Sequence, residues 1–322
     1  MRKFLIATLF VIMTPLAFAG SQRFNANLYS NYLKGLFFIQ NEEYELGLKE
    51  LEKAKAKDPK SIHTRLKIAT VLIRLGKNEE AQKALLEAKK LDPDNLEISL
   101  TLIFIYSYAQ KDKELEAEYE ELLKNAHRLK PDDISISEYL AQFYFYKTKH
   151  EDAINIYESI LENNPEYIEA YFWLGYLYSE IDKEDQAIKV WKDGLDIDSE
   201  HAPILNSLGY TYAEAGILLD DAEKMIKKAL EKEPDNGAYL DSLGWVYYRQ
   251  GKLKKSLKFL EEAISFVRDP DIYKHLGDVS VELGDLEKAI KYYKVGIEYF
   301  PENAGLQSRL EEYESESKES KE

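Results

Sequence analysis

The sequence predicts an all-α protein in which about eight pairs of antiparallel helices follow one another as a solenoid. Two observations lead to this fold class. Prolines mark a regular interval, since Pro59 and Pro93 lie 34 residues apart, as do Pro131 and Pro165. Small and large side chains also recur at fixed places between these markers. A period of this length fits one helix–turn–helix unit, which buries its apolar face by stacking on its neighbours.

The period continues along the chain with small departures. Later unit boundaries fall at Ser199, Pro234, Arg268 and Pro301. Only the interval from Pro93 to Pro131, at 38 residues, differs by about one helical turn. We therefore expect one extra turn in the third unit.

Small residues occupy the eighth position of nearly every unit, where they allow the two helices of a unit to approach closely. The exception is Ile103, in the third unit. The residues at this position are Gly35, Ala69, Ile103, Ala141, Gly175, Gly209, Gly244 and Gly277.

Large residues occupy the twenty-fourth position, and we expect them to fill the space between one helix pair and the next. Glycines such as Gly76 and Gly216 stand between the two helices of a unit, where a left-handed residue can end the first helix. Asp58–Pro59 and similar pairs end the second helix, because proline disfavours helical geometry in the residue before it. The large residues are Leu51, Leu85, Leu123, Tyr157, Trp191, Ile226, Leu260 and Tyr293.

These signals divide the chain into three parts. Residues 1–19 have the pattern of a signal peptide, residues 20–314 form the solenoid, and residues 315–322 are expected to be a disordered polar tail. Leu306, Leu310 and Tyr313 recur at helical spacing and predict a closing helix. The eight units are expected near 28–61, 62–95, 96–133, 134–167, 168–201, 202–236, 237–269 and 270–303.

The spacing, the alternation of small and large positions and the final proline resemble the tetratricopeptide repeat (TPR) family over residues 28–301. This resemblance implies one continuous right-handed superhelix of paired helices, with the first helices on a concave inner face. It also implies that positions 2, 5, 6, 9, 12 and 13 of each unit face a ligand.

Aromatic residues are frequent at these inner positions, and they include Phe104 and Tyr108 in the third unit. One interpretation is that the rings pack against neighbouring first helices without a ligand. The other is that they receive an extended peptide or a partner helix. The predicted groove consists of Tyr139, Phe145, Tyr146, Phe172, Trp173, Tyr176, Asn206, Tyr210, Asp241, Trp245, Tyr248 and Arg249.

Isolated cations also fall on the first helices. Lys67, Arg74, Arg249 and Lys274 could each pair with a partner's carboxylate, or could be solvated charges at the rim. The Lys and Asn pattern that some co-chaperones use to hold a terminal carboxylate is not present, since the second unit offers Leu66 and Thr70 at those positions.

The amino terminus predicts export. Met1-Arg2-Lys3 precedes an apolar run from Phe4 to Phe18, and cleavage is expected after Ala19. The mature chain would then lie in the periplasm or an equivalent compartment, without a lipid-bearing cysteine, because the chain has no cysteine. Membrane association is expected only through a partner or through an uncleaved amino-terminal segment.

Charge and composition exclude several function classes. The net charge is −16, and removal of Arg2 and Lys3 would make it −18, so we expect no binding to nucleic acid. The five histidines lack metal-ligand spacing and are expected at the surface or in the groove, so no metal and no cofactor is predicted. Asp196, Asp198 and Glu200 resemble a calcium loop, but His201 stands where such a loop needs glycine. Catalytic motifs are missing as well, and we predict no enzyme activity.

The favoured hypothesis is a non-catalytic periplasmic scaffold or adaptor that binds a protein or peptide along the groove. Residues 205–300, including "AYLDSLGWVYYRQGKLKKSLKFLEEAI", resemble bacterial envelope TPR lipoproteins that act as adaptors for a periplasmic carboxyl-terminal processing protease. The alternatives are an assembly factor for a pilus, for secretion or for polysaccharide export, and the repeat arm of a glycosyltransferase-type enzyme.

Overall fold

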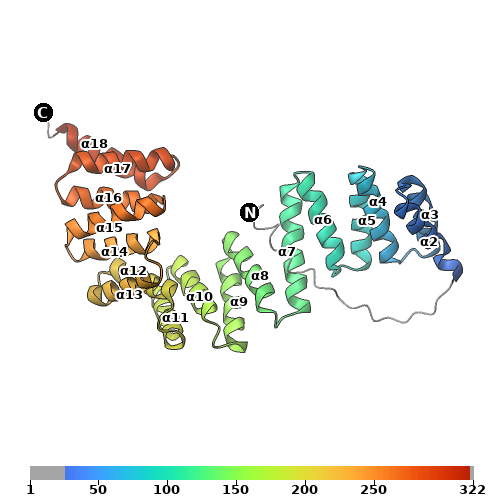
Figure 1. Cartoon of the computed structure of the whole chain (residues 1–322), viewed down its shortest axis with the longest axis horizontal. Coiled ribbons are helices and arrows are strands. Elements are labelled where there is room, and N and C mark those ends of the chain that lie inside the picture. Colours follow the sequence, from blue (N-terminus) through green and yellow to red (C-terminus); the bar gives the residue numbers. More distant parts are fainter. Residues whose placement is uncertain (1–25, 320–322) are drawn as a thin grey trace. The chain divides into compact units, whose positions relative to one another are not determined.

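The structure, a computed structural model, describes residues 26–319, and the predicted signal peptide lies outside them (Figure 1). Within that range the chain forms 17 α-helices and no strand, which confirms the predicted all-α fold class. No helix among these residues combines the length and the apolar character needed to cross a membrane. The helices are α2 (Ala26–Gln40), α3 (Tyr44–Lys57), α4 (Ile62–Arg74), α5 (Asn78–Leu91), α6 (Leu96–Tyr108), α7 (Asp112–Leu129), α8 (Ile134–Tyr146), α9 (His150–Asn163), α10 (Ile168–Glu180), α11 (Glu184–Ile197), α12 (Ala202–Ala215), α13 (Leu219–Lys232), α14 (Gly237–Arg249), α15 (Leu253–Phe266), α16 (Pro270–Glu282), α17 (Leu286–Tyr299) and α18 (Ala304–Glu319).

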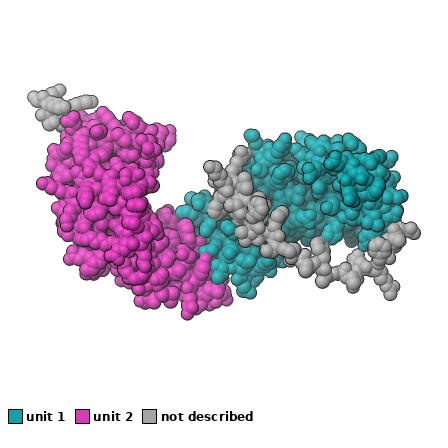
Figure 2. Space-filling model, viewed as in Figure 1, with its two compact units in different colours: residues 1–156 teal, residues 157–322 magenta. Residues whose placement is uncertain are grey.

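The chain forms two compact units, residues 1–156 (unit 1) and residues 157–322 (unit 2) (Figure 2). In each unit the two helices of a pair pack together, as α4 does on α5 and α14 on α15. The second helix of a pair also packs on the first helix of the next pair, as α5 does on α6 and α15 on α16. Each unit is therefore a stack of helix pairs in which every pair covers the apolar face of its neighbour.

Close approach within a pair depends on the small eighth residue. A Cβ atom on Gly244 would lie 2.7 Å from Leu260 Cγ, and one on Gly35 would lie 2.9 Å from the same atom of Leu51. The large twenty-fourth residue thus fills the space that the glycine of its own pair leaves open. We expected these large residues between successive pairs, and Leu260 does contact the next pair, but the structure shows that it also fills the space within its own pair.

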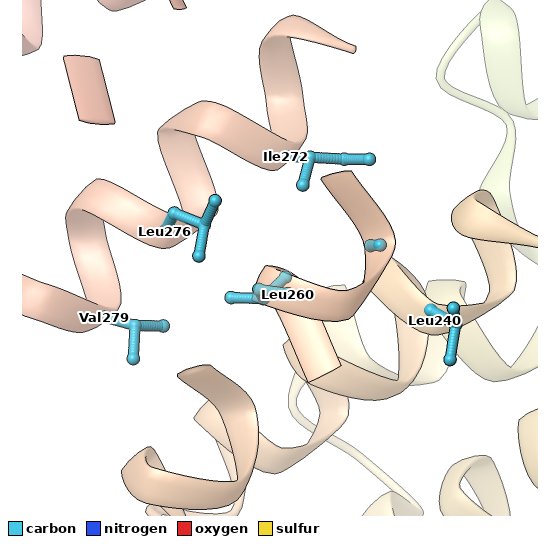
Figure 3. Close-up of a cluster of buried hydrophobic side chains, with 6 residues drawn as sticks. Leu240, Leu260, Ile272, Leu276 and Val279 are labelled. Carbon is cyan, nitrogen blue, oxygen red and sulfur yellow. The ribbon is translucent and has the colours of Figure 1, made fainter. Parts of the chain in front are cut away.

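Apolar residues from three helices join the seventh pair to the eighth (Figure 3). Leu240 on α14, Leu260 on α15 and Ile272 on α16 belong to one buried cluster, in which none is more than 3% exposed. Leu276 and Val279 complete the α16 side. Burial of a side chain of this size contributes roughly 1.5–3 kcal/mol, so each junction between pairs stabilises the stack substantially.

In the described chain each turn between the two helices of a pair contains a residue with a positive φ, and the turn after α12 contains a second one, Leu218. Gly76, Gly216, Gly251 and Gly284 supply it in four turns, with φ between 68° and 76°. The other four turns use non-glycine residues at the equivalent position, although this conformation costs them about 1–2 kcal/mol. These residues are Glu42, Gln110, Thr148 and Asp182. The glycines could be found in the sequence, whereas the other four could not.

Two further expectations concern helix lengths. The extra turn of the third unit lies in α7, which has 18 residues where α5 has 14. At the carboxyl end α18 continues to Glu319. Residues 315–319 are therefore helical, whereas we predicted that they belong to a disordered tail. Leu306 is fully buried and α18 packs on α16 and α17, which stabilises the first turns of this helix. Glu, Lys and Ser then prolong it at little cost.

Candidate partner-binding faces

Unit 1 exposes four aromatic rings on its first helices. Phe37 on α2 meets the ring of Phe38 edge to face, and we call the other three, Phe104, Tyr108 and Tyr146, the aromatic patch. They are 59%, 73% and 62% exposed, respectively. Phe104 and Tyr108 lie one turn apart on α6, and Tyr146 on α8 holds the same repeat position as Tyr108. Neither ring on α6 contacts another aromatic ring or a cation within residues 26–319. Packing of the fold therefore does not account for the α6 rings.

The other predicted groove residues of unit 1 are half-buried. The ring of Phe145 lies 5.7 Å from that of Tyr146 and 5.9 Å from that of His150, measured between centroids. Tyr139 on α8 is also half-buried. Phe145 therefore packs against one ring of the aromatic patch, and neither residue adds an exposed ring to it.

Two cations stand on the first helix that precedes α6. Lys67 and Arg74 on α4 are both exposed, and neither forms an ion pair within the described residues. Some other cations of unit 1 are engaged, since Arg65 pairs with Glu87 at 3.0 Å and Lys147 pairs with Glu116. The α4 surface beside the aromatic patch therefore carries two charges that the fold leaves unused.

In unit 2 the ring of Trp245 is covered on both faces. The ring of Tyr248 lies 4.7 Å away with an interplanar angle of 19°, and the ring of His275 lies 4.1 Å away at 20°. The indole Nε1 is buried and has no hydrogen-bond partner in the described structure. Stacking between α14 and α16 explains this tryptophan without a ligand.

His275 on α16 holds that stack in place through Asp241 on α14. Nδ1 of His275 lies 2.8 Å from Oδ1 of Asp241, and both residues are at most 8% exposed. Burial alone would lower the pKa of His275, but the carboxylates of Asp241 and Asp271 and the hydrogen bond to Asp241 outweigh it and raise the pKa. Our expectation that every histidine lies at the surface or in a groove is wrong for His275, because a carboxylate one helix away compensates its burial.

The remaining predicted residues on α12 and α14 have internal contacts. Arg249 is exposed, but its guanidinium donates a hydrogen bond of 2.8 Å to the carbonyl oxygen of Glu214, at the end of α12. Tyr210 is half-buried, and burial together with Glu214 and Asp241 raises its pKa. The side-chain oxygen of Asn206 is buried without a hydrogen-bond partner in the described chain.

The three predicted aromatic residues on α10 pack on one another. The rings of Phe172 and Trp173 meet edge to face at 5.3 Å, and Trp173 meets Tyr176 at 6.1 Å. Burial, and then Glu180, raises the pKa of Tyr176 to about 12. The nine predicted residues of unit 2 thus form a largely packed wall, with few ring faces open to solvent.

The arrangement offers contact surfaces rather than reactive groups. Among the described residues, no three His, Asp or Glu side chains gather as a metal site would require. The predicted groove does not include Phe104, Tyr108, Lys67 and Arg74, although all four stand at inner positions of the repeat. Two structural features distinguish them from the packed groove residues: all four side chains are exposed, and the two cations form no ion pair within the described residues.

Family models place the chain among known proteins. Four models described as tetratricopeptide repeat match residues 38–103, 156–189, 207–271 and 270–303, and together they cover more than half of the chain. The chain belongs to the tetratricopeptide repeat family. Proteins of this family are generally non-catalytic scaffolds that bind protein partners.

The chain is similar to several solved structures at low sequence identity. The APC/C hetero-tetramer Cut9–Hcn1 is 14% identical with a TM-score of 0.57, over 84% of this chain and 52% of that one, so this chain spans about half of it. A TPR protein from Parabacteroides merdae is 16% identical, with a TM-score of 0.47 over 90% and 99% of the two chains. A thermophilic TPR protein from Thermus thermophilus is 20% identical, with a TM-score of 0.49 over 55% and 96%. A comparison with curated protein sequences gave no significant match.

Proposed function

We propose that this protein is an exported, non-catalytic scaffold that binds another protein through the first-helix face of unit 1. The exposure of Phe104 and Tyr108 carries this proposal. Large rings left in water cost free energy that burial against a partner recovers, at roughly 25 cal/mol for each Å² of apolar surface. The stacked pairs fix both side chains on one rigid helix, which limits the ordering cost of binding.

The proposed location is the periplasm or an equivalent compartment. The charge, apolar run and small-residue site of residues 1–19 support cleavage after Ala19. The sequence has no cysteine, so the folded protein does not depend on disulfides in an oxidising compartment. A periplasmic processing protease is the first partner to test, because residues 205–300 resemble adaptors of such an enzyme. Components of pilus, secretion or polysaccharide-export assemblies are the next.

Site-specific crosslinking in the native envelope tests this function. A photoreactive phenylalanine analogue in place of Tyr108 should capture a defined partner, which mass spectrometry then identifies. The same analogue at Leu86, on the second helix α5 and 37% exposed, is the matched control and should capture little. Equal capture at both sites would contradict the proposal. Amino-terminal sequencing of the recovered protein, expected to begin at Gly20, tests the export step.

A further inference from the structure

We propose that the partner segment bound by unit 1 is acidic and apolar, with its carboxylates on Lys67 and Arg74 and its apolar side chains on Phe104 and Tyr108. This inference rests on the proposed function and assigns a chemistry to the partner. The four residues come from α4 and α6, the first helices of two successive pairs. We call them the docking row.

The spacing of the docking row fits one extended segment. Lys67 and Arg74 are seven residues apart, close to two helical turns, so they lie on the same side of α4. Arg74 and Tyr108 hold the same repeat position on adjacent first helices. In unit 1 the helix α5 packs against both α4 and α6 and joins them. An extended chain rises about 3.3 Å per residue, so a partner that carries a carboxylate and an apolar side chain several residues apart would reach both helices.

The charges of unit 1 favour an acidic occupant over a basic one. The chain has 59 acidic and 43 basic residues, yet the two α4 cations beside the exposed rings have no ion-pair partner in the described structure. The one opposing charge at an inner position of α6 is Glu97, in its first turn, three turns away from Tyr108. Apolar contact with the rings excludes water and strengthens the ion pairs that a partner's carboxylates would form.

Binding of synthetic peptides to the full mature chain tests this chemistry. The probe is a peptide of about twelve residues, which spans about 40 Å when extended, with Glu and Phe recurring among Ser and Gly. Its ends are acetylated and amidated, so that no terminal charge contributes. Two counterparts carry Gln or Lys in place of Glu. We expect the Glu peptide to bind about tenfold more tightly than the Lys peptide, with a difference that shrinks as salt is added.

Charge reversal identifies the residues responsible. Lys67→Glu with Arg74→Glu should weaken the Glu peptide about tenfold and strengthen the Lys peptide. The matched control is Lys83→Glu with Lys90→Glu, which makes the same change in net charge on α5, where both lysines are exposed. The control should alter affinity by less than about twofold. Circular dichroism checks that every variant is folded.

The possible outcomes separate this inference from the proposed function. If Phe104→Ser with Tyr108→Ser abolishes binding of the Gln peptide while charge reversal has no effect, the rings bind a partner and the acidic chemistry is wrong. If the Lys peptide binds as well as the Glu peptide, the inference is overturned. If no peptide binds and sedimentation finds a dimer that Phe104→Ser dissociates, a second copy occupies the row and the inference is likewise overturned. Capture at Tyr108 decides the proposed function independently.

Discussion

Phe104 in unit 1 and Trp245 in unit 2 occupy the same repeat position, yet the first is 59% exposed and the second is stacked on both faces. The difference arises from the neighbouring helices. In unit 2 successive first helices pack directly, α12 on α14 and α14 on α16, whereas in unit 1 they are joined mainly through the second helix between them. A ring at a given position therefore faces solvent or a neighbour according to how closely the next first helix approaches.

The partner of each ring reinforces this contrast. The residue that covers Trp245 is His275, which the carboxylate of Asp241 fixes at 2.8 Å. The equivalent residue one pair after Phe104 is Tyr139, which is half-buried on α8 and leaves Phe104 open. An aromatic residue on a first helix thus stabilises unit 2 and remains available for binding in unit 1.

The largest expected effect tests whether the helix pairs of both units pack closely against a small residue at the eighth position. Gly244→Leu and Gly35→Leu should each cost about 3 kcal/mol of unfolding free energy, because the new side chain overlaps Leu260 or Leu51. Urea unfolding followed by circular dichroism measures this cost. A large loss in one unit and none in the other would show that the helix pairs of the two units are not built alike.

The next effect separates the roles of the two sets of rings. Trp245→Ala should cost about 2 kcal/mol, because it removes the stack between Tyr248 and His275. Tyr108→Ala should change stability by less than about 0.5 kcal/mol, since its ring is 73% exposed. Thermal and urea unfolding compare the two variants directly. Similar costs would mean that the contrast between the units is not one of packing.

The smallest effect is a pH dependence of opposite sign in the two units. The raised pKa of His275 gives stability that is complete below about pH 6.5 and is lost as pH rises through the folded-state pKa. Asp241, Asp269, Asp271 and Lys274 are the charged groups around it. In unit 1 burial lowers the pKa of His127. The stability linked to neutral His127 is therefore complete above about pH 6.5 and is lost as pH falls from there through the lower folded-state pKa.

Unfolding midpoints between pH 5 and pH 8.5 measure both slopes. His275→Gln should remove the decline on the alkaline side, and His127→Gln should remove the decline on the acid side. The two variants serve as controls for each other, because each leaves the other histidine unchanged. Identical pH profiles for the wild type and for either variant would rule out the corresponding assignment.

Much of the scaffold could be predicted from the sequence because its determinants are local and repeat. The proline interval set the unit length, and the small residues at Gly35, Gly209 and Gly244 located the close approach of each helix pair. The turns at Gln110 and Thr148 could not be predicted, since these residues adopt a positive φ only because the packed helices on either side require it.

The candidate site was predictable only as a set of positions. The sequence alone determined which residues stand on the first helices and which of them lie on the inner side, because helical periodicity and the repeat length fix the side of the helix on which each residue lies. Only the tertiary structure decided that Trp245 is covered by His275, that Arg249 binds the end of α12, and that Phe104 and Tyr108 remain in solvent. The physical reason is that exposure depends on the distance to a neighbouring helix, and packing across many residues, rather than the local pattern, sets that distance.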